Sequence, residues 1–245
     1  MVGLKMARSL QHAAVHGQGS VHEGEYEKVT IHGMGHIVGP VKTGEASFQG
    51  DVRVKAHLTF SKMKTAGRCS CHGELDGEEM HVHGDTTLHG EVRVRHVKAS
   101  GKLQVDRGIR GELVQAQGVL HIAGGIECER IELKGSVHVP GLLNASHVSI
   151  MFDENSMIEE IGGEHIRIMY DEKKGWFGRK RLRDVKLKAN SIEGNHVTLE
   201  HTHARIVRGE DVVIGPNCQI ELVEYSRSLE ISSEASVKHQ EKIQL

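Results

Sequence analysis

Residues 81–105 read HVHGDTTLHGEVRVRHVKASGKLQV, and this stretch decides the fold. Apolar and polar residues alternate through it, and its glycines Gly84 and Gly101 are separated by a 17-residue step. The same spacing continues to Gly33 on one side and to Gly135 on the other, so seven glycines recur in phase. A fixed period of this kind is typical of a repeat architecture, in which each repeat forms one structural unit.

The residues between these glycines predict short β-strands. Six positions per repeat, at −4, −2, +2, +4, +8 and +10 from each glycine, never carry Asp, Glu, Lys or Arg, although 26% of the chain is charged. Alternation with a period of two buries one face of a strand. Three alternating pairs per repeat, separated by small corner residues, predict an all-β, three-sided β-solenoid with a 17-residue turn. Its turns would stack about 4.8 Å apart.

The composition agrees with a narrow, stacked interior. The chain of 245 residues contains 29 Gly but only 1 Trp, 3 Tyr and 4 Phe, which is too few rings for an ordinary globular core. A net charge of −2 provides no overall field that would recruit nucleic acid or an anionic membrane. Four cysteines are too few for a disulfide scaffold, and neither a secretory signal nor a membrane-spanning apolar run is apparent. We therefore expect a cytoplasmic chain with reduced thiols.

The phase of the repeat sets the expected boundaries. We predict a β-solenoid over residues 26–237, with tails at 1–25 and 238–245. Residues 151–165 fall out of phase and predict a break, and residues 169–184 form an insertion. Beyond them the period returns weakly. It relates Val212 to Leu229, Ile214 to Ile231, Ile206 to Val223 and Ile220 to Val237.

With this pattern the sequence resembles the bactofilins, bacterial cytoskeletal proteins that form polymers. The resemblance rests on HVHGDTTLHGEVRVRHVKASGKLQV and on VLHIAGGIECERIELKGSVHV, residues 119–139, and it covers 28–150 well and 185–237 loosely. It implies a right-handed β-helix with short unstructured tails. It also implies filaments that grow end to end without nucleotide, often at the inner membrane, and that organise cell shape, surface organelles or motility. The implied partners are the chain itself, a paralogous bactofilin and the anionic inner-membrane surface, with no nucleic acid and no cofactor.

The ends of such a solenoid expose unpaired backbone groups and an open apolar cross-section. Soluble repeat proteins mask such ends with polar capping repeats. Neither end of this sequence contains an amphipathic helix with capping signals, so stacking of one chain on the next is favoured over a tail that folds across the end. The residues predicted to form the polymer end faces are Val29, Ile31, Leu229 and Ile231.

A basic, aromatic segment interrupts the pattern at residues 171–183, DEKKGWFGRKRLR. Trp176 and Phe177 lie between two glycines, and aromatic rings flanked by basic residues suit the membrane interface. We expect a peripheral membrane contact, with a partner protein or single-stranded nucleic acid as alternatives. A purely structural role, in which Trp176 packs on the side of the solenoid, is also open. The contact residues would be Lys173, Lys174, Trp176, Phe177, Arg179, Lys180, Arg181 and Arg183.

The histidines and cysteines raise the alternative of an enzyme or a metal site. His72, His89 and Asp106 share one outward column, as do His121 and His138, and adjacent imidazoles can hold a transition metal. Exposed histidines are more often ordinary surface residues, and Cys69 and Cys71 fall on inward columns, where cysteine behaves as a small apolar residue. We predict no metal site.

The rival function is an enzyme on a left-handed β-helix, a hexapeptide-repeat acyltransferase or a γ-type carbonic anhydrase. Those folds keep a repeat of six residues and thus 18 per turn, whereas the period here is 17. No phosphate-binding loop, nucleophile elbow or zinc-protease motif occurs in the sequence. We therefore predict a structural protein with no catalytic residues.

Overall fold

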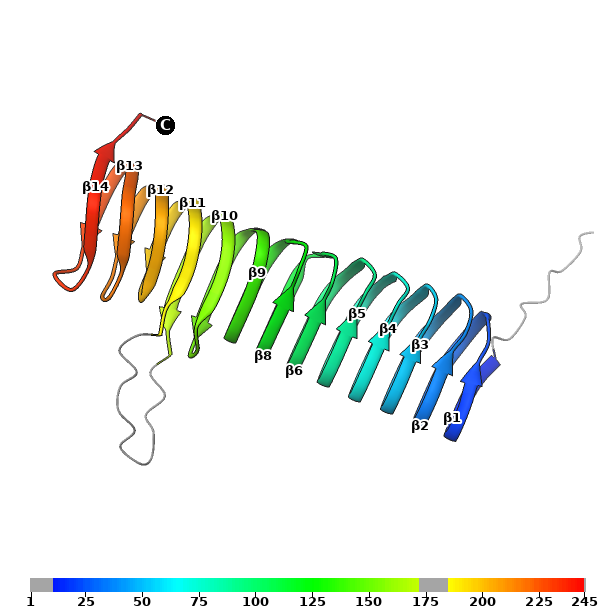
Figure 1. Cartoon of the computed structure of the whole chain (residues 1–245). Coiled ribbons are helices and arrows are strands. Elements are labelled where there is room, and N and C mark those ends of the chain that lie inside the picture. Colours follow the sequence, from blue (N-terminus) through cyan, green and yellow to red (C-terminus); the bar gives the residue numbers. More distant parts are fainter. Residues whose placement is uncertain (1–10, 172–184, 245) are drawn as a thin grey trace, which may run out of the picture.

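The chain forms one elongated, all-β parallel solenoid (Figure 1). The structure is a computed structural model, and it describes residues 11–171 and 185–244. Its 14 strands belong to one sheet that winds through about 13 turns, and the described residues contain no helix. Within these ranges nothing helical is therefore long and apolar enough to cross a membrane. The predicted solenoid and its approximately 17-residue repeat are confirmed.

Each strand between β1 and β14 pairs in parallel with the strand of the preceding turn and with that of the following turn. Two short strands, β7 and β8, share one turn between β6 and β9. The strands are β1 Gln11–Val21, β2 Gly24–Ile37, β3 Val41–Val54, β4 Leu58–Cys71, β5 Leu75–Leu88, β6 Val92–Val105, β7 Ile109–Arg110, β8 Leu113–Ile122, β9 Ile126–Phe152, β10 Ser156–Tyr170, β11 Leu187–Leu199, β12 Thr202–Ile214, β13 Gln219–Ile231 and β14 Ser236–Lys242.

The in-phase glycines are required by the backbone. Gly84, for example, has φ +104, in the region that disfavours L side chains, and it pairs with Gly67 and Gly101 in the neighbouring turns. A Cβ atom at Gly84 would lie well inside van der Waals contact with the carbonyl oxygen of Gly67. Each turn thus stacks so closely on the preceding one that a side chain has no room here, which explains the strict spacing.

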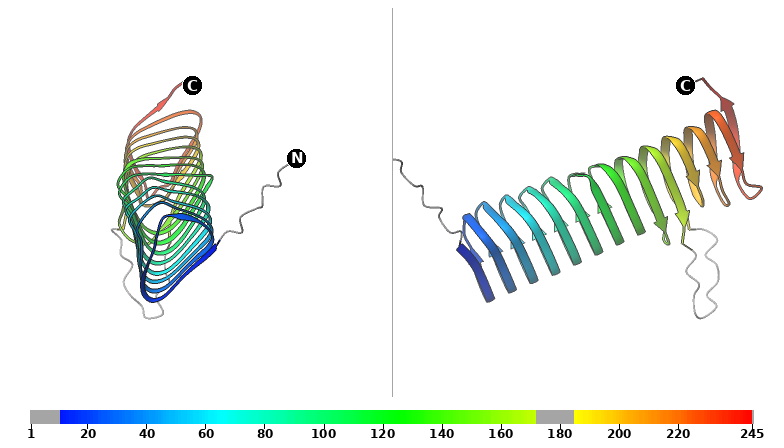
Figure 2. Two further views of the ribbon diagram at one scale, coloured as in Figure 1. Left: turned by 90° about the vertical axis from the view of Figure 1, so that its right-hand side faces the viewer. Right: turned by 180° about the vertical axis from the view of Figure 1, so that it is seen from behind.

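The predicted inward columns form the core. Val97, Val105 and Ile109 of one turn are all fully buried, and Phe48 and Phe60 also point inward, as predicted. The turns lie one behind another in the left view of Figure 2, and paired residues of adjacent turns occupy equivalent positions. The core is therefore one continuous stack of small aliphatic residues rather than a cluster of rings.

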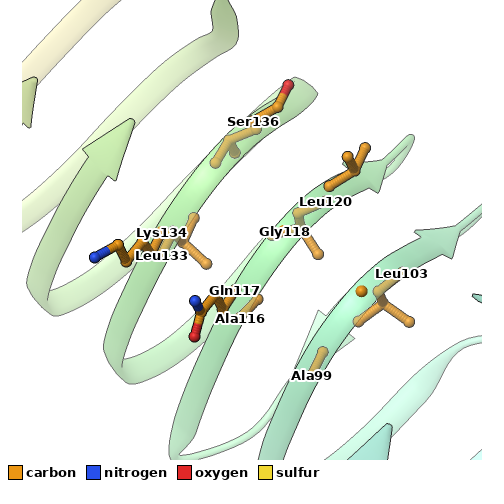
Figure 3. Close-up of a pocket in the computed structure, with 12 residues that line it drawn as sticks. Ala99, Leu103, Ala116, Gln117, Gly118, Leu120, Leu133, Lys134 and Ser136 are labelled. Atoms are coloured by element: carbon orange, nitrogen blue, oxygen red, sulfur yellow. The ribbon is translucent and has the colours of Figure 1, made fainter. Parts of the chain in front are cut away.

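One place in this core is incompletely filled. At the position occupied by Val82 and Leu133 in other turns, β6 and β8 carry Ala99 and Ala116. A narrow cavity of about 10 Å³ lies beside them, close to Leu103 and Leu120 (Figure 3). A space of this size holds at most about one water molecule. This cavity is a packing defect and is too small for a ligand.

The predicted loss of phase at 151–165 is present, but these residues do not break the solenoid. Residues 156–170 form β10, which pairs with β9 on one side and with β11 on the other. The phase is lost because this turn is longer. His165 pairs with His147 across an 18-residue step, and the register shifts between Ile158 and Glu160. The inward positions survive this change, since Ile158, Ile161 and Ile166 are buried.

Other boundaries also differ from the prediction. Gln11–Val21 is a strand paired with β2, and β14 extends to Lys242, so most of both predicted tails belongs to the solenoid. The period does not reveal the first turn, because its inward residues include Ala13 and Gly19 and because a 16-residue step relates it to β2. The insertion begins later than residue 169, since β10 runs to Tyr170. In the C-terminal turns, Ile206 pairs with Leu222 rather than with Val223.

Candidate assembly edges and outward columns

The two ends of the solenoid lie at opposite extremes of the molecule and are formed by β1 and β14 (Figure 1). Within the described ranges each of these strands pairs with one neighbour only, whereas the strands between them pair on both sides. A free strand edge presents unpaired N–H and C=O groups that favour the addition of another strand. On the outer side of β1 there is free space even at the corner glycine Gly17, where a Cβ atom would meet nothing within 4 Å.

The predicted end residues lie in different environments. Val29 and Ile31 are both 0% exposed, because β1 covers the turn in which they lie. Their placement at the N-terminal face is therefore wrong, and β1 forms that face instead. At the other end Leu229 is partly buried and Ile231 is 40% exposed. β14 pairs with β13 only as far as Tyr225, so the described residues leave 226–231 without a strand on the outer side.

The basic aromatic residues 173–183 lie outside the described residues. Their flanks are anchored in the solenoid. The Asp171 carboxylate, directly after β10, forms an ion pair with Lys134 at 3.2 Å. Val185, shortly before β11, is buried. The two flanks therefore belong to adjacent turns of the solenoid.

Outward side chains stack into columns of complementary charge along the first turns. The Lys28 ammonium lies 3.1 Å from the Glu45 carboxylate, and that of Lys62 lies 2.7 Å from Glu79, one turn apart in each case. The hydrogen bond and charge of Lys62 hold the pKa of Glu79 below its ordinary value. These columns stabilise the stack of turns, although each exposed pair alone contributes little.

The predicted histidine columns are present. The rings of His72 and His89 lie 4.5 Å apart, and those of His121 and His138 are stacked at 4.7 Å. His89 Nδ1 lies 2.6 Å from the Asp106 carboxylate. The hydrogen bond from Gln104 lowers the pKa of Asp106 most, and the hydrogen bond with His89 lowers it further.

A longer histidine column is not evident from the period of the sequence. His147, His165 and His196 stack on successive turns, with ring centroids 5.1 and 4.7 Å apart. The 18-residue turn and the 31-residue step between Ser156 and Leu187 conceal this relation, because a 17-residue period does not connect the three positions. Their common signal is the sequence His-apolar-polar-apolar, which recurs at 147–150, 165–168 and 196–199.

Three side chains place potential metal donors together in the described part of the chain. The donor atoms of His57, Glu74 and Asp76 lie within 4.8 Å of one another. Arg93, however, donates to both carboxylates, with its Nε 2.9 Å from Asp76. These acids raise the pKa of Arg93, so the guanidinium stays charged at their centre. The cluster is thus an ion-pair network in which Arg93 occupies the place between the carboxylates and balances part of their negative charge.

Three of the four cysteines are interior residues, whereas Cys128 is half-buried. Cys69, Cys71 and Cys218 are buried, which confirms the inward placement of the first two. Burial raises the pKa of both Cys69 and Cys71 to about 12 and that of Cys218 to about 11. Thiols with such pKa values are poor nucleophiles and poor metal ligands at neutral pH.

Comparisons with known proteins found two curated relatives, both from Bacillus subtilis (strain 168). The chain is 36% identical over 103 residues to uncharacterized protein YhbF and 40% identical over 104 residues to uncharacterized protein YhbE. The matched stretch spans 42% of this chain and 42% and 43% of the two relatives, which is less than half of their length. No family model matches the chain. No solved structure matches it either.

Proposed function

We propose that this protein is a structural, non-catalytic scaffold of the bactofilin type that assembles end to end into filaments without nucleotide. The observation that carries the proposal is the pair of open ends: β1 and β14 each pair on one side only within the described residues. Parallel strands of a second chain can continue the hydrogen-bonded stack at either end. In this proposal the partners are further copies of the chain and, where one is present, a paralogous bactofilin.

The proposed solenoid is right-handed and three-sided. Three inward pairs per turn, separated by corners, support a triangular path, as in the turn Val97, Leu103, Val105, Ile109. Every turn of such a path repeats the same cross-section, which lets identical chains stack without a specialised joining element. Filaments of this kind would organise cell shape, surface organelles or motility.

The proposed location is the cytoplasm, at the inner face of the membrane. Support comes from the composition of residues 173–183, in which Trp176 and Phe177 are flanked by six basic residues, each of which contributes about 1 kcal/mol on an anionic surface. A vesicle-pelleting assay with anionic lipid tests this contact. The Trp176→Ala/Phe177→Ala variant should pellet less than the wild type, and equal pelleting would remove the membrane contact from the proposal.

Electron microscopy of the purified chain tests assembly directly. The wild type should form filaments, whereas Leu229→Arg or Ile231→Arg should leave short oligomers or monomers, because a charge at the C-terminal edge opposes the docking of another apolar cross-section. Val119→Arg is the matched control, since Val119 is 46% exposed on the side of the solenoid, away from both ends. A monomeric wild type in light scattering, with no filaments in the micrographs, would refute the proposal.

Gly17→Ala probes the N-terminal edge. In the single chain the added Cβ atom meets nothing within 4 Å. In a filament the same atom would point at the backbone of the adjoining turn, as a Cβ atom on Gly33 would point at Gly17. Because Gly17 has φ +89, the alanine also strains β1 itself, so we expect a chain that folds with a small loss of stability and assembles weakly. Filaments as long as those of the wild type would exclude β1 from the joint.

A further inference from the structure

The long histidine column forms one wall of a surface groove of about 300 Å³ on β9, β10 and β11. We call it the β9–β11 groove. A second outward row, two residues further along each strand, forms the facing wall. The polar side chains of the groove are Arg130, Glu132, His147, Ser149, His165, Arg167, His196 and Thr198. Between the two rows lie the inward residues Ile131, Val148 and Ile166, whose backbones form the floor.

The groove contains an unusual concentration of unpaired positive charge. Outward arginines of the described chain are mostly held by carboxylates: Arg93 by Glu74 and Asp76, Arg208 by Glu193 and Glu224. Arg130 and Arg167 are both exposed, and no carboxylate of residues 11–171 or 185–244 lies within ion-pair distance of either. Because the whole chain has a net charge of −2, this charge is a local feature of the groove.

Two acids at the groove, Glu132 and Asp211, have hydrogen-bond partners outside it. Glu132, the groove's one carboxylate, accepts a hydrogen bond of 2.7 Å from Gln115 Nε2 on the preceding turn. Asp211, at the end of the histidine column, binds Arg227 and Ser228, and it lies 3.1 Å from His196 Nδ1. The contact with Asp211 orients the His196 ring and leaves Nε2 free. The groove thus offers mainly donors.

We infer that the β9–β11 groove binds a phosphate group, carried either by a lipid headgroup or by a soluble phosphate compound. Two guanidinium groups supply planar, paired donors that match phosphate oxygens. Ser149 and Thr198 add hydroxyl donors, and the imidazoles add ring N–H donors one turn apart. A transition metal is disfavoured here, because Arg130 lies one 17-residue turn before His147 and Arg167 lies beside His165.

The test compares two sources of phosphate on the full, untagged chain. Calorimetric titration with pyrophosphate measures the soluble source, and flotation with vesicles of phosphatidic acid in phosphatidylcholine, against phosphatidylcholine alone, measures the lipid source. With whichever of the two phosphate sources the groove binds, Arg130→Gln/Arg167→Gln should weaken binding at least about tenfold, since it removes two charged donors to the phosphate oxygens. Added salt should weaken wild-type binding in the same arm.

Arg107→Gln is the matched control. Arg107 is also exposed and lacks an ion pair within the described residues, but it lies outside the groove. The Arg107→Gln variant should bind phosphate like the wild type. Circular dichroism should show that all variants are folded, because neither groove arginine supports the core. His165→Gln, which removes one imidazole in the middle of the column, should weaken binding less than the double variant.

A tenfold loss in either arm that is specific to the groove variants supports the inference and identifies the source. No difference between wild type and the double variant in both arms overturns it, including the case in which vesicles bind through residues 173–183 instead. The inference does not depend on filament assembly, which electron microscopy measures separately on the same samples.

Discussion

The first and the last turns of this solenoid use one backbone plan under different constraints. From β2 to the start of β9 every turn follows a 17-residue step, and each carries a glycine with positive φ at the same corner, from Gly33 to Gly135. From β9 onward the steps between paired residues become 18 or 19, then 31, 15 and 16 or 17. No glycine of β10–β14 has a positive φ. The strict period therefore accompanies the corner glycine with positive φ.

One outward column shows the same division in its side chains. In the first turns it alternates in sign, so each charge has a partner one turn away. In the last turns it consists of three imidazoles preceded by an unpaired arginine. The column contains Lys28, Glu45, Lys62, Glu79, His96, Leu113, Arg130, His147, His165, His196, Asp211 and Ser228. In the regular half, from β2 to the start of β9, charged side chains of the column pair with one another. In the irregular half, from β9 onward, the column leaves donors available to a ligand.

The largest expected difference between the two halves is the loss of stability when a glycine is replaced by alanine. Gly84→Ala should lower the free energy of unfolding by about 3 kcal/mol or more, because it combines a strained φ with a backbone clash. Gly162→Ala, in the irregular half, should cost less than about 1 kcal/mol, since its Cβ would meet only the Asn144 side chain, at 3.0 Å. Urea denaturation measures both. Equal losses would show that the corner glycine does not set the period.

The next test concerns the acid stability of the irregular half. The hydrogen bonds from Arg227, which have the larger effect, and from Ser228 hold the pKa of Asp211 well below its ordinary value of 3.8. A depressed pKa in the folded state adds stability above the unfolded-state pKa, and this stability is lost as the pH falls toward the folded-state pKa. Asp211→Asn should therefore show a smaller loss of stability between pH 5 and pH 2 than the wild type in thermal melts at each pH. Asp85→Asn, which removes an exposed acid without an ion pair in the described chain, should follow the wild type.

The regular half could be predicted from the sequence almost completely, and the reason is physical. A carbonyl oxygen lies against each corner glycine and leaves no room for a side chain. Glycine therefore recurs in the sequence at the length of one turn. Inward columns then follow by alternation, and Met63, Met80 and Val97 lie buried at the predicted positions. The location of β1 could not be predicted this way, because an end turn buries one side only and tolerates Ala13 and Gly19 as inward residues.

The irregular half was predicted less well because its turns differ in length. Gly163, Gly194 and Gly209 still stack backbone on backbone there, but none has a positive φ and they do not recur at one fixed step. An extra residue before β10 moves every later position out of phase while the buried face stays intact. The histidine column and the β9–β11 groove depend on pairing across these unequal turns, so a fixed period could not bring His147, His165 and His196 together. Their recurring local pattern was the available signal.

Charge reversal tests the difference between the two parts of the outward column. Lys62→Glu would place three acids on successive turns, between Glu45 and Glu79, and should lower the melting temperature by roughly 2 °C at low salt. His165→Glu would insert an acid between two imidazoles and should not lower it. High salt should remove most of the Lys62→Glu effect through screening. Equal effects in the two halves would mean that the column charges do not stabilise the stack.

The smallest expected effect is a gain in stability from filling the defect in the regular half. Ala116→Val adds two methyl groups beside the 10 Å³ cavity next to Leu103 and Leu133, in a strand that favours β-branched residues. We expect a stabilisation of about 0.5–1 kcal/mol in urea denaturation. Ala46→Val is the control, because Ala46 is 0% exposed and lies away from that cavity, so the added bulk should destabilise by about 1–3 kcal/mol. If Ala116→Val also destabilised the chain, the turn around β8 would already be fully packed, and its two alanines would be required by the spacing of the strands.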